Sequence, residues 1–233
     1  MTATLDCAQL TTREINSTIK QLAAEGEAEI HLLNPEARHS LGVAIFYPVK
    51  ILVEGTAGYY CGAMADGPTF HIKGNSGWSV GECMLSGEIV VERNTASGTG
   101  ASMRGGSVVV KGHAGGRTGI SQKGGLIVVG GDTGYMTGFM MQKGVMVICG
   151  NAADGLGDSM YAGTIYLGGE VGELGNDAVL KEMSGDDVRF LTETLARYGL
   201  SEKRSIADFK KIGSGGRLHN FSKADFELWR VAM

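Results

Sequence analysis

Side chains that could serve as nucleophiles are present in this chain, but their spacing does not assemble a catalytic set. A nucleophilic site needs Ser or Cys together with His and an orienting acid, and no such combination follows from the spacing here. A glutaminase that works through an N-terminal cysteine needs that thiol at the mature terminus. Here Thr2 follows Met1, and the first cysteine is Cys7. We therefore expect that activity to be absent from this chain.

The cysteines and histidines lack the spacing of a metal site. The four cysteines are Cys7, Cys61, Cys83 and Cys149, without a CxxC pair. We expect them to be reduced, small core residues in a reducing compartment. The five histidines are His31, His39, His71, His113 and His219, and they show no ligand spacing either. The sequence therefore predicts no metal on this chain.

Two kinds of phosphate-binding loop are also disfavoured. No GxxxxGK[ST] motif occurs, and the many glycines fall between short apolar runs instead of opening a helix. Nucleotide binding of the Walker or Rossmann type is therefore not expected, and we predict no cofactor on this chain.

Four aspartates near turn signals leave a carbohydrate enzyme as an alternative. They are Asp66, Asp132, Asp154 and Asp158. A polysaccharide lyase or hydrolase built on a β-helix could gather carboxylates in this way, but turn chemistry explains Asp at such positions equally well. Aromatic residues, which sugar sites use as platforms, make up only 7% of the chain. A left-handed hexapeptide acyltransferase is a further alternative, although its six-residue period does not match the period found here.

Length and charge limit the class of protein. At 233 residues with 43% hydrophobic content, the chain can bury the core of one domain with small appendages. A net charge of −4 gives no basic excess of the kind that nucleic acid or an anionic membrane surface attracts. No signal-peptide pattern and no run of eighteen apolar residues occurs. We expect a cytoplasmic protein that binds neither nucleic acid nor membrane.

The 38 glycines follow a period of nineteen residues. Each period from Val49 onward contains one short strand rich in β-branched residues and two glycine-containing turns. The second turn holds Gly62, Gly81, Gly100, Gly119, Gly138 and Gly157, with Asn176 in the seventh period. Glycine and asparagine are the residues that most readily adopt positive φ. We therefore expect a left-handed corner at each of these positions.

This period predicts one coil of a parallel β-solenoid, in which each strand pairs with the next one nineteen residues on. The second and fourth strand positions, such as Ile51 and Val53, are apolar in all seven coils, as a core requires. The recurring methionines Met64, Met84, Met103, Met141 and Met160 are expected to fill the same core.

The third strand position should face outward, yet it is almost as apolar as the core. Strands that are apolar on both faces are usually covered on both faces. A cover must therefore come from the ends of the chain or from another protein. The candidate partner-facing stripe consists of Leu52, Val90, Val109, Val128, Val147 and Tyr166.

The regions outside the repeat carry helix signals. Thr11 or Thr12 can cap a helix that ends near Gly26, and a strand over 29–33 follows. Ser184 and Asp187 form a start like a capping box, after which Val188, Leu191, Leu195 and Tyr198 make an apolar stripe. The predicted divisions are an N-terminal cap over 1–48, the β-helix over 49–181, and a helix with a docking tail over 182–233. We expect the two helices to close the ends of the solenoid.

The repeats GSVVVKGHAGGRTG, GLIVVGGDTGYMTG and GVMVICGNAADGLG resemble the GxGxG domain that ends the large subunit of glutamate synthase. The similarity runs from about residue 12 to about residue 220 and includes the segments REIN and RLHNF. Formylmethanofuran dehydrogenase has a subunit of similar type. In this family the domain is a right-handed β-helix without catalytic residues, placed between a glutaminase domain and a synthase domain. The resemblance thus implies an all-β, right-handed parallel β-helix of about seven coils with short flanking α-helices.

A free-standing chain of this length, with the segment EMSGDDVRFL and the tail KKIGSGGRLHNFSKADFELW, is most similar to small subunits of N-methylglutamate synthases. That resemblance implies a complex that makes N-methylglutamate from methylamine and glutamate. Its other subunits would be a glutaminase-like (class II amidotransferase-type) subunit and an FMN-binding glutamate-synthase-like subunit with an iron–sulfur cluster. The present chain would be a non-catalytic spacer in this hetero-oligomer. A GxGxG subunit of glutamate synthase or of formylmethanofuran dehydrogenase, and a stand-alone scaffold, remain alternatives.

Overall fold

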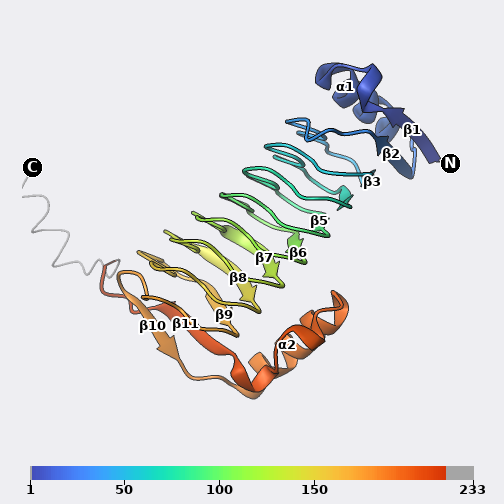
Figure 1. Cartoon of the computed structure of the whole chain (residues 1–233). Coiled ribbons are helices and arrows are strands. Elements are labelled where there is room, and N and C mark those ends of the chain that lie inside the picture. Colours follow the sequence, from blue (N-terminus) through green and yellow to red (C-terminus); the bar gives the residue numbers. More distant parts are fainter. Residues whose placement is uncertain (1, 219–233) are drawn as a thin grey trace, which may run out of the picture.

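The protein forms a rod of stacked coils, seen here in a computed structural model that describes residues 2–218. One sheet runs the length of the rod (Figure 1), and within the described range its strand order is β1-β2-β3-β4-β5-β6-β7-β8-β9-β11-β10. The strands are β1 (Thr2–Asp6), β2 (Glu29–Leu33), β3 (Lys50–Val53), β4 (Thr69–Ile72), β5 (Glu88–Val91), β6 (Ser107–Val110), β7 (Lys123–Val129), β8 (Lys143–Ile148), β9 (Thr164–Leu167), β10 (Ala178–Lys181) and β11 (Lys210–Ser214). The helices are α1 (Thr12–Ala24) and α2 (Gly185–Arg197), with short 3-10 turns η1 (Cys7–Gln9), η2 (Ser201–Lys203) and η3 (Ile206–Asp208).

The pairing of strands follows the nineteen-residue period. Ile51 pairs with Phe70, Phe70 with Ile89, and Ile89 with Val108, always in parallel. Bridges between isolated residues repeat the same spacing on a second side of each coil, from Ala57 to Ser76 and onward. The predicted β-solenoid of about seven turns with two flanking helices is therefore confirmed.

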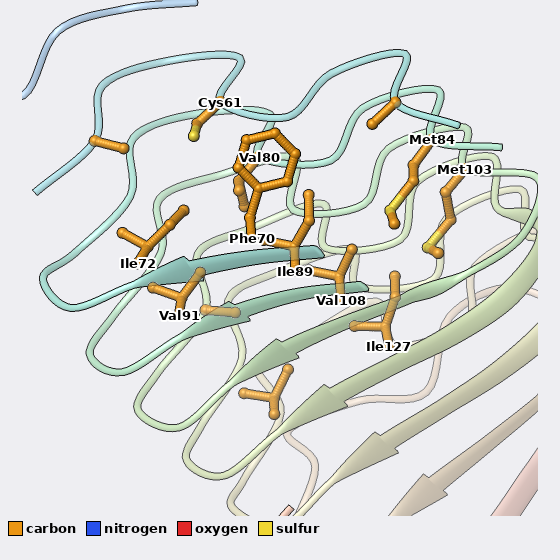
Figure 2. Packing of buried hydrophobic residues seen from close by; sticks show 14 of the residues in the cluster. Cys61, Phe70, Ile72, Val80, Met84, Ile89, Val91, Met103, Val108 and Ile127 are labelled. Atoms are coloured by element: carbon orange, nitrogen blue, oxygen red, sulfur yellow. The ribbon is translucent and has the colours of Figure 1, made fainter. Parts of the chain in front are cut away.

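The solenoid encloses an apolar core. The second and fourth strand residues point inward and are fully buried, among them Phe70, Ile89 and Ile127. Figure 2 shows Met84 and Met103 reaching toward these strands from the opposite wall of the coil. Four of the five recurring methionines are buried as predicted, but Met64 is 47% exposed. In its coil, Ala65 lies nineteen residues before Met84 and takes the core position instead.

The six corner glycines of the second turn all have left-handed backbones, with φ between +63° and +73°. Space as well as conformation demands glycine there, because a Cβ on Gly100 would lie 2.7 Å from Cδ1 of Ile127. The expectation for Asn176 was wrong, and Asp177 adopts positive φ (+62°) instead. The last coil is one residue short, since Leu156 bridges to Leu174 over eighteen residues.

Helix α1 closes the N-terminal end of the solenoid (Figure 1). It begins with a capping box, in which the Thr11 hydroxyl accepts from the Glu14 N–H and the Glu14 carboxylate accepts from the Thr11 N–H. Its residues Ile15 and Ile19 are fully buried and belong to the same core cluster as the inward side chains of the coils. The predicted helix and the strand that follows it are both present.

Helix α2 does not close the opposite end, so that expectation was wrong. The sheet is instead extended beyond β9 by β11 and β10, which pair antiparallel. Helix α2 runs back alongside the strands and packs on their outer face (Figure 1). Neither helix has the length and apolar character needed to cross a bilayer, within the residues that the structure describes.

Candidate functional site

The outer face of the sheet is covered by the chain itself over its C-terminal half. Val109, Val128, Val147 and Tyr166 are at most 5% exposed and cluster with Leu191 and Leu195 of α2, together with Tyr198, Leu200 and Phe209. The sequence interpretation of these four positions as partner-facing is therefore corrected, because α2 and the segment after it supply the cover. Leu52 and Val90, the remaining members of the stripe, are half-buried, and Val90 packs at the margin of this cluster.

The apolar stripe predicted for α2 also needs one correction. Leu191, Leu195 and Tyr198 are buried against the sheet, whereas Val188 is 43% exposed. Val188 lies in the first turn of the helix and is not part of the buried cluster between α2 and the strands.

Two polar networks fasten α2 to the sheet. At its N-terminus, the buried carboxylate of Asp187 accepts hydrogen bonds from the Tyr166 hydroxyl, from the Ser184 N–H and hydroxyl at 2.7 Å, and from Lys211 Nζ at 2.9 Å. At its C-terminus, Oε2 of Glu88 accepts from the Tyr198 hydroxyl at 2.8 Å. These contacts hold the helix in one position on the strands.

In the first network, the pKa of the Asp187 carboxyl is lowered and the pKa of the Tyr166 phenol is raised. The hydrogen bond from Tyr166, supported by those from Ser184 and Lys211, holds the pKa of Asp187 well below its usual range. Burial raises the pKa of the Tyr166 phenol, and the neighbouring Asp187 carboxylate raises it further. Both groups therefore keep their ordinary charge at neutral pH, as a structural ion pair with Lys211 requires.

The first turn of each coil carries a ladder of polar side chains. Every side chain in the ladder except the last, Glu170, accepts a hydrogen bond from the backbone N–H of the equivalent residue in the next coil. The ladder runs through Thr56, Asn75, Asn94, His113, Asp132, Asn151 and Glu170, with distances from 2.7 to 3.3 Å. These residues stabilise the stacking of the coils, and Asp132 is one of them.

The other turn aspartates are used in a similar way. Asp66 accepts from the Ser86 hydroxyl at 2.6 Å, and Asp158 accepts from the Asn176 N–H at 3.0 Å. Within residues 2–218, no three His, Cys, Asp or Glu side chains lie close enough together to hold a metal ion. Turn chemistry therefore accounts for three of the four aspartates that a carbohydrate enzyme would need.

The thiols are distributed between core and surface. All four cysteines are free; Cys7, Cys61 and Cys149 are buried, whereas Cys83 is half-buried. Burial raises the pKa of the Cys61 thiol to about 12 and that of Cys149 to about 11. These two thiols are thus unsuited to nucleophilic attack at neutral pH.

The turn side of the solenoid, opposite the strands, carries an open groove that the sequence interpretation missed. It has a volume of about 560 Å³. Its lining consists of Trp78, Ser79, Glu82, Ser97, Gly98, Ala101, Ser102, Arg117, Ile120, Ser121 and Tyr135. Trp78 and Tyr135 are 55% and 50% exposed. The signal was available in the sequence, because Tyr59, Trp78 and Tyr135 stand at multiples of nineteen residues from one another.

The comparisons with known proteins agree with this architecture. Residues 42–193 match the family described as the GXGXG motif, and the chain belongs to this family. Protein GlxC of Rhizobium meliloti (strain 1021) is 48% identical over 219 residues, which cover 94% of this chain and 96% of that protein.

A solved structure shares the fold. It is the formyltransferase/hydrolase complex (FhcABCD) of Methylorubrum extorquens in complex with methylofuran. One chain of that complex is similar to the present chain, with a TM-score of 0.50. The match covers 66% of this chain and 68% of the other at 22% identity. At this level of identity the likeness supports the solenoid fold alone.

Proposed function

We propose that this chain is a non-catalytic structural subunit of a glutamate-synthase-like complex, and specifically of an N-methylglutamate synthase. Its role is to space and join a glutaminase-like subunit and a subunit that carries FMN and an iron–sulfur cluster. The observation that carries the proposal is membership in the GXGXG family, whose motif matches residues 42–193.

The use of the polar side chains supports a structural role. The turn ladder, the two capping boxes and the Asp187 network satisfy backbone groups or hold α2 on the sheet. A solenoid in which each coil is paired with both neighbours is stiff along its axis. Such a rod can fix the distance between two active sites on either side of it.

The exposed surface supports an assembled state. Large apolar side chains on the turn side, including Phe46, Tyr60 and Trp78, are between 45% and 60% exposed. Clusters of exposed apolar residues on a globular chain usually mark a contact with another macromolecule. The resemblance to the GxGxG domain of glutamate synthase supports a glutaminase-like and a synthase-like partner, because that domain lies between a glutaminase and a synthase domain.

Native purification from the source organism tests this proposal. The expected result is co-purification of a glutaminase-like protein and a flavin and iron–sulfur protein, with a yellow-brown absorption spectrum. The reconstituted complex should convert methylamine and glutamate to N-methylglutamate, and omitting this chain should abolish that activity. Full activity without the chain would contradict the proposal. Co-purification with formylmethanofuran dehydrogenase subunits would instead assign it to that complex.

A further inference from the structure

The groove on the turn side interrupts a stack of aromatic rings. One column of equivalent turn positions holds His39, Tyr59, Trp78, Ser97, Gly116 and Tyr135 in successive coils. The rings of His39 and Tyr59 are stacked with centroids 4.2 Å apart, and those of Tyr59 and Trp78 with centroids 5.1 Å apart. Ser97 provides no ring for the next place in the stack. One face of Trp78 is therefore left open toward the groove.

Tyr135 forms the opposite wall. Its ring lies over Gly116, where a Cβ would approach Cδ1 of Tyr135 to 2.9 Å. Three coil steps of about 4.8 Å separate Trp78 from Tyr135, which is about 14 Å. Leaning of Tyr135 over Gly116 shortens this gap, and the remaining space accepts a planar group that stacks on Trp78 at the usual centroid distance of about 4.5 to 7 Å.

The positively charged side chain of Arg117 lies at the Tyr135 end of the groove. The guanidinium carbon of Arg117 lies 5.3 Å from the centroid of the Tyr135 ring. No carboxylate among residues 2–218 forms an ion pair with Arg117. The hydroxyl-bearing residues Ser97, Ser102 and Ser121 line the groove beside it. This end of the groove is therefore complementary to a carboxylate with a further hydrogen-bonding group.

The groove continues toward the N-terminal coils. A second hollow of about 260 Å³ shares Glu82 with the first and is lined by Tyr60, Met64 and Cys83, among others. Together the two hollows span the coils from Ser40 to Tyr135. Five coil steps amount to about 24 Å, the length of about seven residues of extended chain. An open, elongated and partly apolar groove of this length fits a polypeptide segment better than a small molecule.

We propose that this groove binds an extended segment of a partner subunit. The segment places an aromatic side chain against the open face of Trp78 and a carboxylate against Arg117, and its apolar residues continue over Tyr60 and Met64. A basic residue of the segment pairs with Glu82, at the junction of the two hollows. This inference rests on the proposed function in that the partner belongs to the same complex.

The test measures binding of the full chain to its co-purified partner subunits. Arg117→Glu and Trp78→Ser are each expected to weaken binding at least tenfold. Arg93→Glu and Leu180→Ser are the matched controls, because both positions are exposed and lie outside the groove. The controls should bind within twofold of the wild type. Trp78→Ser also removes the stacking contact with Tyr59 and could disturb the neighbouring coil. In that case the binding measured for Arg117→Glu decides the test.

Labelling of Cys83 with a maleimide gives a second measurement. This thiol lines the second hollow, whereas the other three cysteines are buried. Its labelling rate should fall at least tenfold in the assembled complex relative to the free chain. Equal rates together with unchanged binding of both groove variants would overturn the inference and leave the proposed function intact.

Two further outcomes separate the alternatives. A wild-type chain that purifies without any partner would contradict the proposed function itself. A free chain that dimerises, and loses its dimer in Arg117→Glu, would show that a second copy occupies the groove and would overturn the assignment to a partner subunit.

Discussion

The hydroxyl of Tyr198 donates a hydrogen bond of 2.8 Å to Oε2 of Glu88, 110 residues earlier in the chain. The same carboxylate oxygen accepts from the Ser107 hydroxyl and from Arg197, both at 2.9 Å. This contact joins the end of α2 to the strand β5 in the middle of the rod. The helix is therefore fixed at its C-terminus independently of the Asp187 network at its N-terminus.

A double-mutant cycle measures this contact. Tyr198→Phe and Glu88→Gln are each expected to lower the free energy of unfolding by about 1 to 3 kcal/mol, since each removes or weakens a charge-assisted hydrogen bond. The double variant should cost less than the sum of the two, because the shared bond can be lost only once. Chemical denaturation of the four proteins gives the coupling energy. Glu193→Gln, at an exposed position on the same helix, is the control and should change stability by less than about 0.5 kcal/mol. Strict additivity would mean that the bond contributes nothing.

Asp187 should make the stability of the chain depend on pH in the acid range. Its pKa in the folded protein lies below its usual value, chiefly through the Tyr166 hydrogen bond. A lowered pKa contributes stability that is fully present above the unfolded pKa of about 3.9 and is lost as the pH falls below it. We expect Asp187→Asn to be less stable than the wild type by about 2 kcal/mol at pH 7. The difference should shrink as the pH falls from about 5 to about 3.

Thermal unfolding across this pH range checks the second prediction. Asp186→Asn is the matched control, because the neighbouring Asp186 is 84% exposed at its side chain and pairs with Arg189 on the surface. The control should follow the wild-type curve. A constant offset between Asp187→Asn and the wild type at every pH would show that the ionised form of Asp187 is not what stabilises α2.

Much of this fold could be predicted from the sequence, because the physical cause of each feature lies in its own repeat. The period of nineteen, the inward columns such as Ile51 and Phe70, and the left-handed corners at Gly62 and its equivalents follow from alternation and from glycine chemistry. The caps at Thr11 and Ser184 are likewise local patterns. Each of these features needs only nearby residues to be specified.

The placement of α2 could not be predicted in the same way. The amphipathic pattern shows that Leu191 and Leu195 need an apolar surface, and Val128 and Val147 need a cover, but no local signal pairs the two sets. That pairing depends on the turn after Lys181 and on the antiparallel return of β11, both of which are tertiary. The aromatic groove escaped notice for a different reason. Trp78 and Tyr135 belong to one column of equivalent positions. The groove exists because the two positions between them, Ser97 and Gly116, carry no large side chain, and the aromatic residues alone do not indicate this.

The packing of α2 on the outer face of the sheet should stabilise the folded chain in proportion to the apolar area that it buries. Leu195→Ala removes a buried side chain from the cluster with Val128 and Val147, and large-to-small changes of this kind cost about 2 to 5 kcal/mol. Val188→Ala on the same helix should cost less than about 1 kcal/mol, because Val188 is 43% exposed. Urea unfolding with size-exclusion chromatography checks both. We also expect Leu195→Ala to self-associate more readily, since loosening of α2 exposes the valine column. Equal costs at the two positions would contradict the packing of α2 described above.

The corner glycines should tolerate substitution far less well than a glycine in an ordinary helical position. Gly100 has φ of +63°, and an added Cβ would meet Cδ1 of Ile127 at 2.7 Å and Sδ of Met103 at 3.1 Å. The left-handed conformation alone costs a non-glycine residue about 1 to 2 kcal/mol, and the contact with Ile127 forces a further shift in a close-packed core. We therefore expect Gly100→Ala to lower the free energy of unfolding by about 2 to 4 kcal/mol.

Gly185→Ala supplies the comparison, because nothing lies within 4 Å of its Cβ position and its backbone is helical. Alanine there reduces the entropy of the unfolded chain without strain, so this variant should be neutral or more stable by up to about 1 kcal/mol. Opposite signs for the two glycine-to-alanine changes are the expected result of chemical denaturation. If both variants lost similar stability, the corner conformation would not be the reason why glycine recurs every nineteen residues.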